Sequence, residues 1–175
     1  MTGIFSWRSF WFFWLGGLIV FSILVATGSS LMTEVAPSGI LDHQSAATAD
    51  RVNEIQQSWT SLGLLNEARW SMIGDLVFIG LYMSGGIIGG RLIWQEARSP
   101  SLKKLGLAII LIYFVFGLSD YIETISQITQ LIRNAGSDLL AGTAATARPI
   151  KIVTWIAGTL LMVVALIWRR SERHS

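Results

Sequence analysis

Runs of apolar residues, separated by short polar segments, dominate the hydrophobic pattern of this chain. Four runs are long: residues 10–31, 72–94, 106–131 and 150–168. Each is close to the ~20 residues that a helix needs to cross the hydrocarbon core of a bilayer. Because backbone groups in lipid must find their hydrogen bonds within the segment, we expect all four runs to be helices. The pattern therefore predicts an all-α integral membrane four-helix bundle, with residues 1–175 forming a single domain.

Between the first and second runs the pattern becomes periodic. Val52, Ile55 and Trp59 recur at helical spacing opposite polar positions, which predicts an amphipathic helix over about residues 45–62. Such a helix can lie on a membrane surface or cover the end of a bundle. Two roles are open for it: a connector that covers helix ends, or a lid or partner-docking surface over a site.

The remaining connections differ in length and composition. Residues 96–104 are few and include Pro100, so we expect the second and third runs to be antiparallel neighbours. Residues 134–148 are rich in Gly, Ala, Ser and Thr, and we expect a loop there. Pro149 would then occupy the first turn of the fourth helix, where proline is well tolerated.

Composition and charge agree with a membrane location. Of all residues 52% are hydrophobic and only 14% are charged, well below the roughly one quarter usual in soluble domains. Nine of the eleven acidic residues fall on the side of the amphipathic helix. Basic residues gather at the other helix ends: Arg8, Arg91, Arg98, Lys103, Lys104, Arg169, Arg170 and Arg173.

An excess of Lys and Arg marks the cytoplasmic side of a membrane protein. We therefore expect a multi-pass protein of the cell inner membrane, with both termini cytoplasmic and the amphipathic helix outside. Topology and contacts with anionic lipid headgroups account for the basic residues, so no nucleic-acid partner is expected. The first run also resembles a signal peptide, with Arg8 before it and small residues after it. It is longer and more aromatic than a signal peptide's apolar core, so we expect a retained helix.

Four ionisable side chains lie inside the predicted spans: Asp75, Asp120, Glu123 and Lys151. A charge within a bilayer costs a few kcal/mol, so such groups usually pair, face a cavity or carry function. With a helical rise of ~1.5 Å per residue, all four fall at a similar depth in the outer half of the bundle. Helical spacing also places each on a face that we expect to point inward.

Further residues join this predicted cluster. Arg69 and Arg148 lie near the outer interface and could reach it by extending their side chains along the helices. Tyr82 shares a helix face with Asp75, and Tyr113 shares one with Asp120. The cluster is open to two interpretations, an ion-pair network that fixes helix register or the wall of a polar pocket.

Small residues form a second pattern. Gly85 and Gly89 are four residues apart, as are Gly86 and Gly90, and such repeats allow another backbone to approach closely. A further pair, Gly16 and Gly17, lies at comparable depth in the first run. These glycines would either tighten the cytoplasmic half of the bundle or mediate association into a homo-oligomer or a larger membrane complex.

The sequence lacks the residues that several kinds of catalytic and metal site require. The chain has no cysteine, and its two histidines, His43 and His174, lie outside the predicted spans. We therefore expect no haem or zinc site with histidine or cysteine ligands, no other metal site and no serine triad. No cofactor is indicated by the sequence.

The function that these features favour is a membrane binding or accessory module with a charged pocket in the outer half of the bundle. Membrane lipids are the expected partners. One alternative is a membrane enzyme that acts on a lipophilic or lipid-linked substrate through carboxylate acid–base chemistry. The other is a small proton- or cation-coupled transporter subunit, which would need oligomerisation because one chain has few helices.

Overall fold

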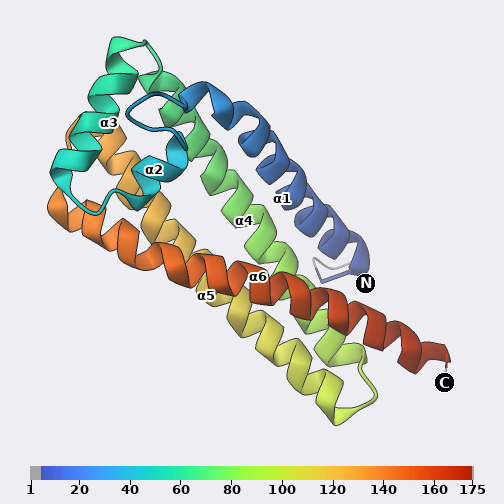
Figure 1. The fold of residues 1–175 in the computed structure, drawn as a ribbon. Coiled ribbons are helices and arrows are strands. Elements are labelled where there is room, and N and C mark those ends of the chain that lie inside the picture. The colour runs from blue at the N-terminus through green and yellow to red at the C-terminus, as the bar shows by residue number, and fades with distance from the viewer. Residues whose placement is uncertain (1–4, 175) are drawn as a thin grey trace.

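The computed structural model describes residues 5–174, and every regular element among them is helical (Figure 1). The elements are α1 (Trp7–Thr27), the 3₁₀ turn η1 (Gly28–Leu31), α2 (Ile40–Ser45), α3 (Ala49–Ser61), α4 (Leu65–Glu96), α5 (Pro100–Arg133) and α6 (Asp138–His174). Four helices, α1, α4, α5 and α6, are long and apolar enough to cross a membrane. The chain is thus an all-α, multi-pass membrane protein, as the apolar runs predict.

The four long helices pack in chain order. α1 lies against α4, α4 against α5 and α5 against α6, whereas α1 and α6 make no comparably close backbone approach. At one end of the bundle sit α2 and α3, which we call the cap (Figure 1). At the other end, the terminal end, lie the start of α1, the end of α6 and the turn between α4 and α5 (Figure 1).

Local sequence signals explain where several helices begin. Ser6, Thr48 and Ser99 are the N-caps of α1, α3 and α5, and each side chain accepts a hydrogen bond from a backbone N–H of the first turn. Pro100 follows Ser99 at the start of α5, where its missing N–H costs nothing. The short turn between α4 and α5 makes these helices neighbours, as expected.

The predicted amphipathic helix is present as α3, and a further short helix, α2, precedes it. Val52, Ile55 and Trp59 are fully buried, and the indole N–H of Trp59 donates to Leu31 O at 2.9 Å. These side chains pack with Met72 of α4 and Leu131 of α5 in a second apolar core. The cap is therefore anchored on the ends of the long helices.

The predicted loop over residues 134–148 is wrong. α6 begins at Asp138, so Pro149 lies within the helix and not in its first turn. The physical reason is a buried stripe of small residues: Ala141, Ala144 and Ala147 recur every third residue and are buried. Helix packing against the cap and α5 stabilises this extension, and composition alone does not reveal such packing. One missing proline N–H does not outweigh it.

The glycines of α4 lie in close contact with other helices of the same chain. A Cβ at Gly85 would lie 2.5 Å from the backbone of Trp14, and one at Gly89 would lie 2.7 Å from Phe10 and Met162. Gly86 contacts the ring of Tyr113, and Gly90 faces Gly106 O, 2.8 Å from an added Cβ. Of the other two predicted glycines, Gly17 packs on Tyr82, whereas Gly16 has no neighbour within 4 Å. The α4 repeats thus allow α1, α5 and α6 each to approach α4 closely.

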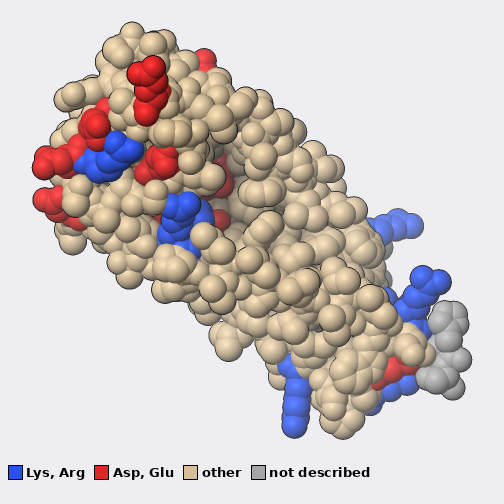
Figure 2. Space-filling model, viewed as in Figure 1, with Lys and Arg blue, Asp and Glu red and all other residues tan. Residues whose placement is uncertain are grey.

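Charged side chains are segregated along the bundle, with acidic groups gathered towards the cap and basic groups at the terminal end (Figure 2). Two acids, Glu96 and Glu172, lie among these basic groups, and both accept hydrogen bonds. Glu96 accepts hydrogen bonds from Trp7 Nε1 at 2.7 Å, Arg169 Nη2 at 2.7 Å and Arg173 Nη2 at 2.6 Å. This ion-pair group joins α1, α4 and α6 at the terminal end.

Candidate binding pocket

One face of α5 is polar along its cap half. Its buried polar residues follow helical spacing: Ser119, Asp120, Glu123, Thr124, Ser126, Gln127 and Gln130. Burial of polar groups is costly unless they are hydrogen-bonded, so each of these side chains requires a partner. Ser119 and Ser126 donate to backbone carbonyl oxygens of α5 itself, whereas the partners of Asp120, Thr124 and Gln127 come from α6, α4 and the cap.

Lys151 of α6 reaches two of these groups. Its Nζ donates to Asp120 Oδ1 at 2.9 Å and lies 3.0 Å from Glu123 Oε1. The Glu123 side chain is fully buried and that of Asp120 is 2% exposed. The contact with Glu123 is an ion pair without hydrogen-bond geometry, and within residues 5–174 neither Glu123 oxygen has a hydrogen-bond donor. One lysine is thus shared by two carboxylates on one turn of α5.

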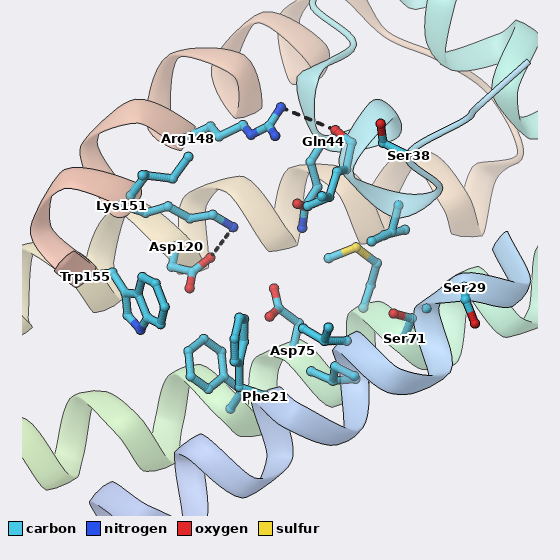
Figure 3. Close-up of a pocket in the computed structure, with 18 of the residues that line it drawn as sticks. Phe21, Ser29, Ser38, Gln44, Ser71, Asp75, Asp120, Arg148, Lys151 and Trp155 are labelled. Atoms are coloured by element: carbon cyan, nitrogen blue, oxygen red, sulfur yellow. Dashed lines mark hydrogen bonds and ion pairs between the residues drawn. The ribbon is translucent and has the colours of Figure 1, made fainter. Parts of the chain in front are cut away.

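Asp75 of α4 stands slightly apart. Its Oδ2 accepts a hydrogen bond from Thr124 Oγ1 at 2.8 Å. Thr124 is a neutral donor, and among the described residues no Lys or Arg forms an ion pair with Asp75. The carboxylate points into an open space between α1 and α6, facing Asp120 and Lys151 (Figure 3).

That space is a pocket of about 350 Å³. At its inner end, away from the cap, lie the aromatic side chains Phe21, Phe78, Phe116 and Trp155. At the cap end it is covered by α2 and the residues before it: Ser38, Ile40, Leu41 and Gln44. Figure 2 shows a hollow on this face with acidic atoms at its bottom and a basic side chain beside it.

The pocket exists because α1 and α6 do not close on each other. Their side chains meet at Phe21 and Trp155, whose ring centroids are 5.4 Å apart, and the gap towards the cap stays open. Its rim includes Val25 of α1 and Ile152 of α6, which are 63% and 42% exposed. The opening between the two helices is therefore bordered by apolar side chains on the surface that a bilayer would cover.

The two arginines of the predicted cluster have different positions. Arg148 lies at the rim of the pocket, where its Nη1 donates to Leu41 O of α2 at 3.3 Å (Figure 3). Arg69 is elsewhere, since its Nε donates to Leu131 O at 3.0 Å and its Nη1 to Asn66 Oδ1 at 2.9 Å. Only Arg148 is placed to meet a molecule in the pocket.

The two tyrosines lie below the pocket and do not line it. Tyr113 accepts a hydrogen bond from Trp14 Nε1 at 2.8 Å, and Tyr82 is hydrogen-bonded to Thr159 Oγ1 at 2.6 Å. The two phenol oxygens are 3.4 Å apart. This network links α1, α4, α5 and α6 in the middle of the bundle, and the packed rings close the pocket on its inner side.

The cap is tied to the polar face of α5 through His43 of α2. Gln127 Nε2 donates to His43 O at 3.1 Å, and the His43 ring lies 3.1 Å from Gln56 Nε2 of α3. Burial lowers the pKa of His43 to about 4, so the ring is neutral at physiological pH. α2 is thereby held over the pocket from two sides.

Several pocket residues were not predicted from sequence. Thr124, which bonds Asp75 without lining the pocket, carried a usable signal, because it is polar, lies within a span and falls four residues after Asp120. Phe21, Phe78 and Phe116 carried none, since aromatic residues are common throughout these helices. The lining from α2 depended on a helix that the pattern did not reveal.

The site therefore has a charged wall, an aromatic inner end and an apolar rim. Within residues 5–174 no group of three His, Cys, Asp or Glu side chains is arranged to hold a metal ion. Comparison with protein-family models, with curated proteins and with solved structures finds no match for this chain. Fold and site together define a multi-pass membrane protein with a charged pocket between its long helices.

Proposed function

We propose that this chain is a membrane binding module whose pocket takes the polar group and adjoining apolar part of an amphiphilic molecule. The observation that carries the proposal is the pocket's division between a charged wall, formed by Asp75, Asp120 and Lys151, and a remaining lining that is mostly apolar. A water-soluble ligand would not need the apolar rim, and a pure hydrocarbon would leave the charges unpaired.

The pocket is large enough for only a small part of such a molecule. A volume of about 350 Å³ lies at the lower end of the ~300–1,000 Å³ usual for ligand pockets. It has room for a headgroup and a few methylene groups. The rest of an apolar chain would leave between α1 and α6, past Val25 and Ile152, into the surrounding lipid.

Packing in the other half of the bundle favours binding over transport. Tyr82 and Tyr113 are 0% and 1% exposed, and they fill the centre of the bundle below the pocket together with Trp14. A transport path would have to cross this packed layer. The carboxylates next to a lysine are also compatible with an enzyme, but no contact in the structure favours that alternative specifically.

The segregation of charge supports a placement in the bacterial inner membrane with the terminal end in the cytoplasm. The pocket then lies in the outer half of the bilayer, where a ligand could enter from the outer leaflet. Membrane lipids remain the expected partners.

The test is to block the pocket without disturbing the fold. Gly28 lines the pocket, has a helical backbone conformation with φ −67°, and a Cβ there meets no atom within 4 Å. Gly28→Leu should therefore fold and reduce the amount of amphiphile that co-purifies. Gly142→Leu is the matched control, because Gly142 also has free space but does not line the pocket.

Native mass spectrometry of protein purified in a mild detergent is the readout. We expect a bound amphiphile on wild type and on Gly142→Leu, and a reduced amount on Gly28→Leu. Equal occupancy in all three proteins, or no bound molecule on wild type after incubation with membrane lipid extract, would contradict the proposal.

A further inference from the structure

We infer that the molecule held in this pocket carries an organic ammonium group, which binds between the Asp75 carboxylate and the aromatic inner end. The inference rests on the proposed function and specifies its ligand. Two kinds of ligand have this chemistry, an amine-headed phospholipid and a single-chain amphiphile. Both carry a positively charged nitrogen on an apolar chain.

The charge balance of the cluster supports a cation. Three carboxylates, Asp75, Asp120 and Glu123, face two cationic side chains, Lys151 and the rim residue Arg148, which leaves one net negative charge. Among the described residues only Lys151 forms ion pairs with any of the three, whereas Arg148 donates to a backbone carbonyl oxygen of α2. Lys151 is already committed to Asp120 and Glu123 at 2.9 and 3.0 Å. Unpaired charge in apolar surroundings is costly, so a second cation in the pocket would be stabilised.

Asp75 is placed to receive that cation. Asp75 Oδ2 accepts a hydrogen bond from Thr124 Oγ1 at 2.8 Å, and the carboxylate faces the open pocket (Figure 3). An anionic headgroup would instead share the lining with two carboxylates, Asp75 and Asp120, while Lys151 is already paired with Asp120 and Arg148 lies at the rim. Like charges within one pocket repel strongly where little water is present.

The aromatic inner end supplies the second element of ammonium recognition. Phe21 lies 5.3 Å from Phe78 and 5.4 Å from Trp155, and Phe78 lies 6.0 Å from Phe116, measured between ring centroids. All four rings line the pocket on the side away from the cap. Faces of aromatic rings attract ammonium groups, and a carboxylate beside such rings is a recurrent way to bind them.

The probes are three amphiphiles with the same ten-carbon chain: decyltrimethylammonium, decyl sulfate and the neutral decanol. Each is titrated into the purified full-length protein in a neutral maltoside detergent, and the dissociation constant is obtained from the change in thermal unfolding temperature. We expect wild type to bind the ammonium compound at least about tenfold more tightly than either other probe, the equivalent of about 1.4 kcal/mol.

Two variants and one control variant connect this preference to the residues. Asp75→Asn should lose most of it while decanol binding is unchanged, and Asp50→Asn, on the exposed side of α3, should behave as wild type. Phe21→Leu removes a ring but no charge, and it should also weaken the ammonium compound selectively. This second variant keeps the test decisive if Asp75→Asn does not fold.

The outcomes separate the inference from the proposed function. If decanol or decyl sulfate binds as tightly as the ammonium compound, the inference is overturned and the binding function stands. If none of the three binds, both are overturned. Where the preference holds, native mass spectrometry with equal phosphatidylethanolamine and phosphatidylglycerol identifies the source: selective retention of the amine lipid indicates a phospholipid, and no retention indicates a single-chain ammonium.

Discussion

At the scale of single residues, Lys151 is the side chain on which the charged cluster depends. It is 15% exposed and pairs with two carboxylates that are almost fully buried. Removing one partner of a buried ion pair typically costs ~3–5 kcal/mol, because the other charge stays buried and unpaired. Lys151→Met should therefore destabilise the protein by a few kcal/mol, whereas Arg148→Met at the rim should cost ~1 kcal/mol or less. Unfolding in detergent measures both.

A double substitution tests whether Asp120 is the coupled partner. Lys151→Met with Asp120→Asn should recover part of the loss, because the second substitution removes one of the carboxylates that the first leaves without a cation. If the free energies of the two single substitutions simply add, Lys151 and Asp120 are not coupled. Glu123 would then be the partner that matters more.

His43 predicts a pH dependence of stability. Its pKa is about 4 in the folded protein and 6.5 in the unfolded chain, so between these values only the unfolded state takes up a proton. Stability from this group is complete above about pH 6.5 and falls as the pH drops towards 4, by about 3 kcal/mol in total. His43→Gln should lose this component. Unfolding temperatures of both proteins from pH 7.5 to 4.5 give the comparison, and parallel curves would refute the assignment.

At the scale of helices, the glycines of α4 decide how closely its neighbours pack. Gly86 lies directly against the ring of Tyr113, so a methyl group there would have to displace the ring and disturb its hydrogen bond with Trp14. We expect Gly86→Ala to destabilise the protein by ~1–3 kcal/mol, the usual cost of overpacking. Gly16→Ala is the control on α1, where an added Cβ meets nothing within 4 Å. It should be neutral or stabilising by up to ~1 kcal/mol, since alanine favours a helix. Equal effects in chemical unfolding would contradict this packing.

Helix α6 illustrates what element-scale prediction from sequence misses. Ala, Gly and Thr between residues 138 and 148 carry little hydropathy signal, and Pro149 is typical of a helix start. The helix nevertheless runs through this segment because Ala141 and Ala144 are buried against neighbouring elements. Helix α2, with only six residues, is likewise stabilised by tertiary contacts such as that between Gln127 and His43.

At the scale of the whole molecule, the charge segregation predicts the orientation in the membrane. A phosphatase that is active only outside the cytoplasm should be inactive when fused after Ser175. The same enzyme should be active when fused after Ala47, which is exposed in the turn between α2 and α3. The reason is the basic terminal end, which is retained on the cytoplasmic side. The reverse pattern of activity would invert the topology and place the pocket in the cytoplasmic leaflet.

What the sequence by itself determined is the part governed by local physics. Hydropathy and backbone hydrogen bonding require four helices, and α3 follows from its buried stripe at helical spacing. The depth of Asp75, Asp120, Glu123 and Lys151 also follows, because helical rise is constant and these charges cannot face lipid. The structure brings Lys151 to Asp120 and Glu123 within ion-pair distance.

Only the tertiary structure decided which neighbours meet across the bundle. Contacts between residues distant in sequence place Tyr82 and Tyr113 in a closed core and bring Arg69 to a backbone carbonyl. Such contacts also keep α1 and α6 apart on the cap side of Phe21 and Trp155. The pocket is a consequence of that last feature. Helical periodicity specifies the face on which a side chain lies, but the space between two helices is set by every side chain that packs around them.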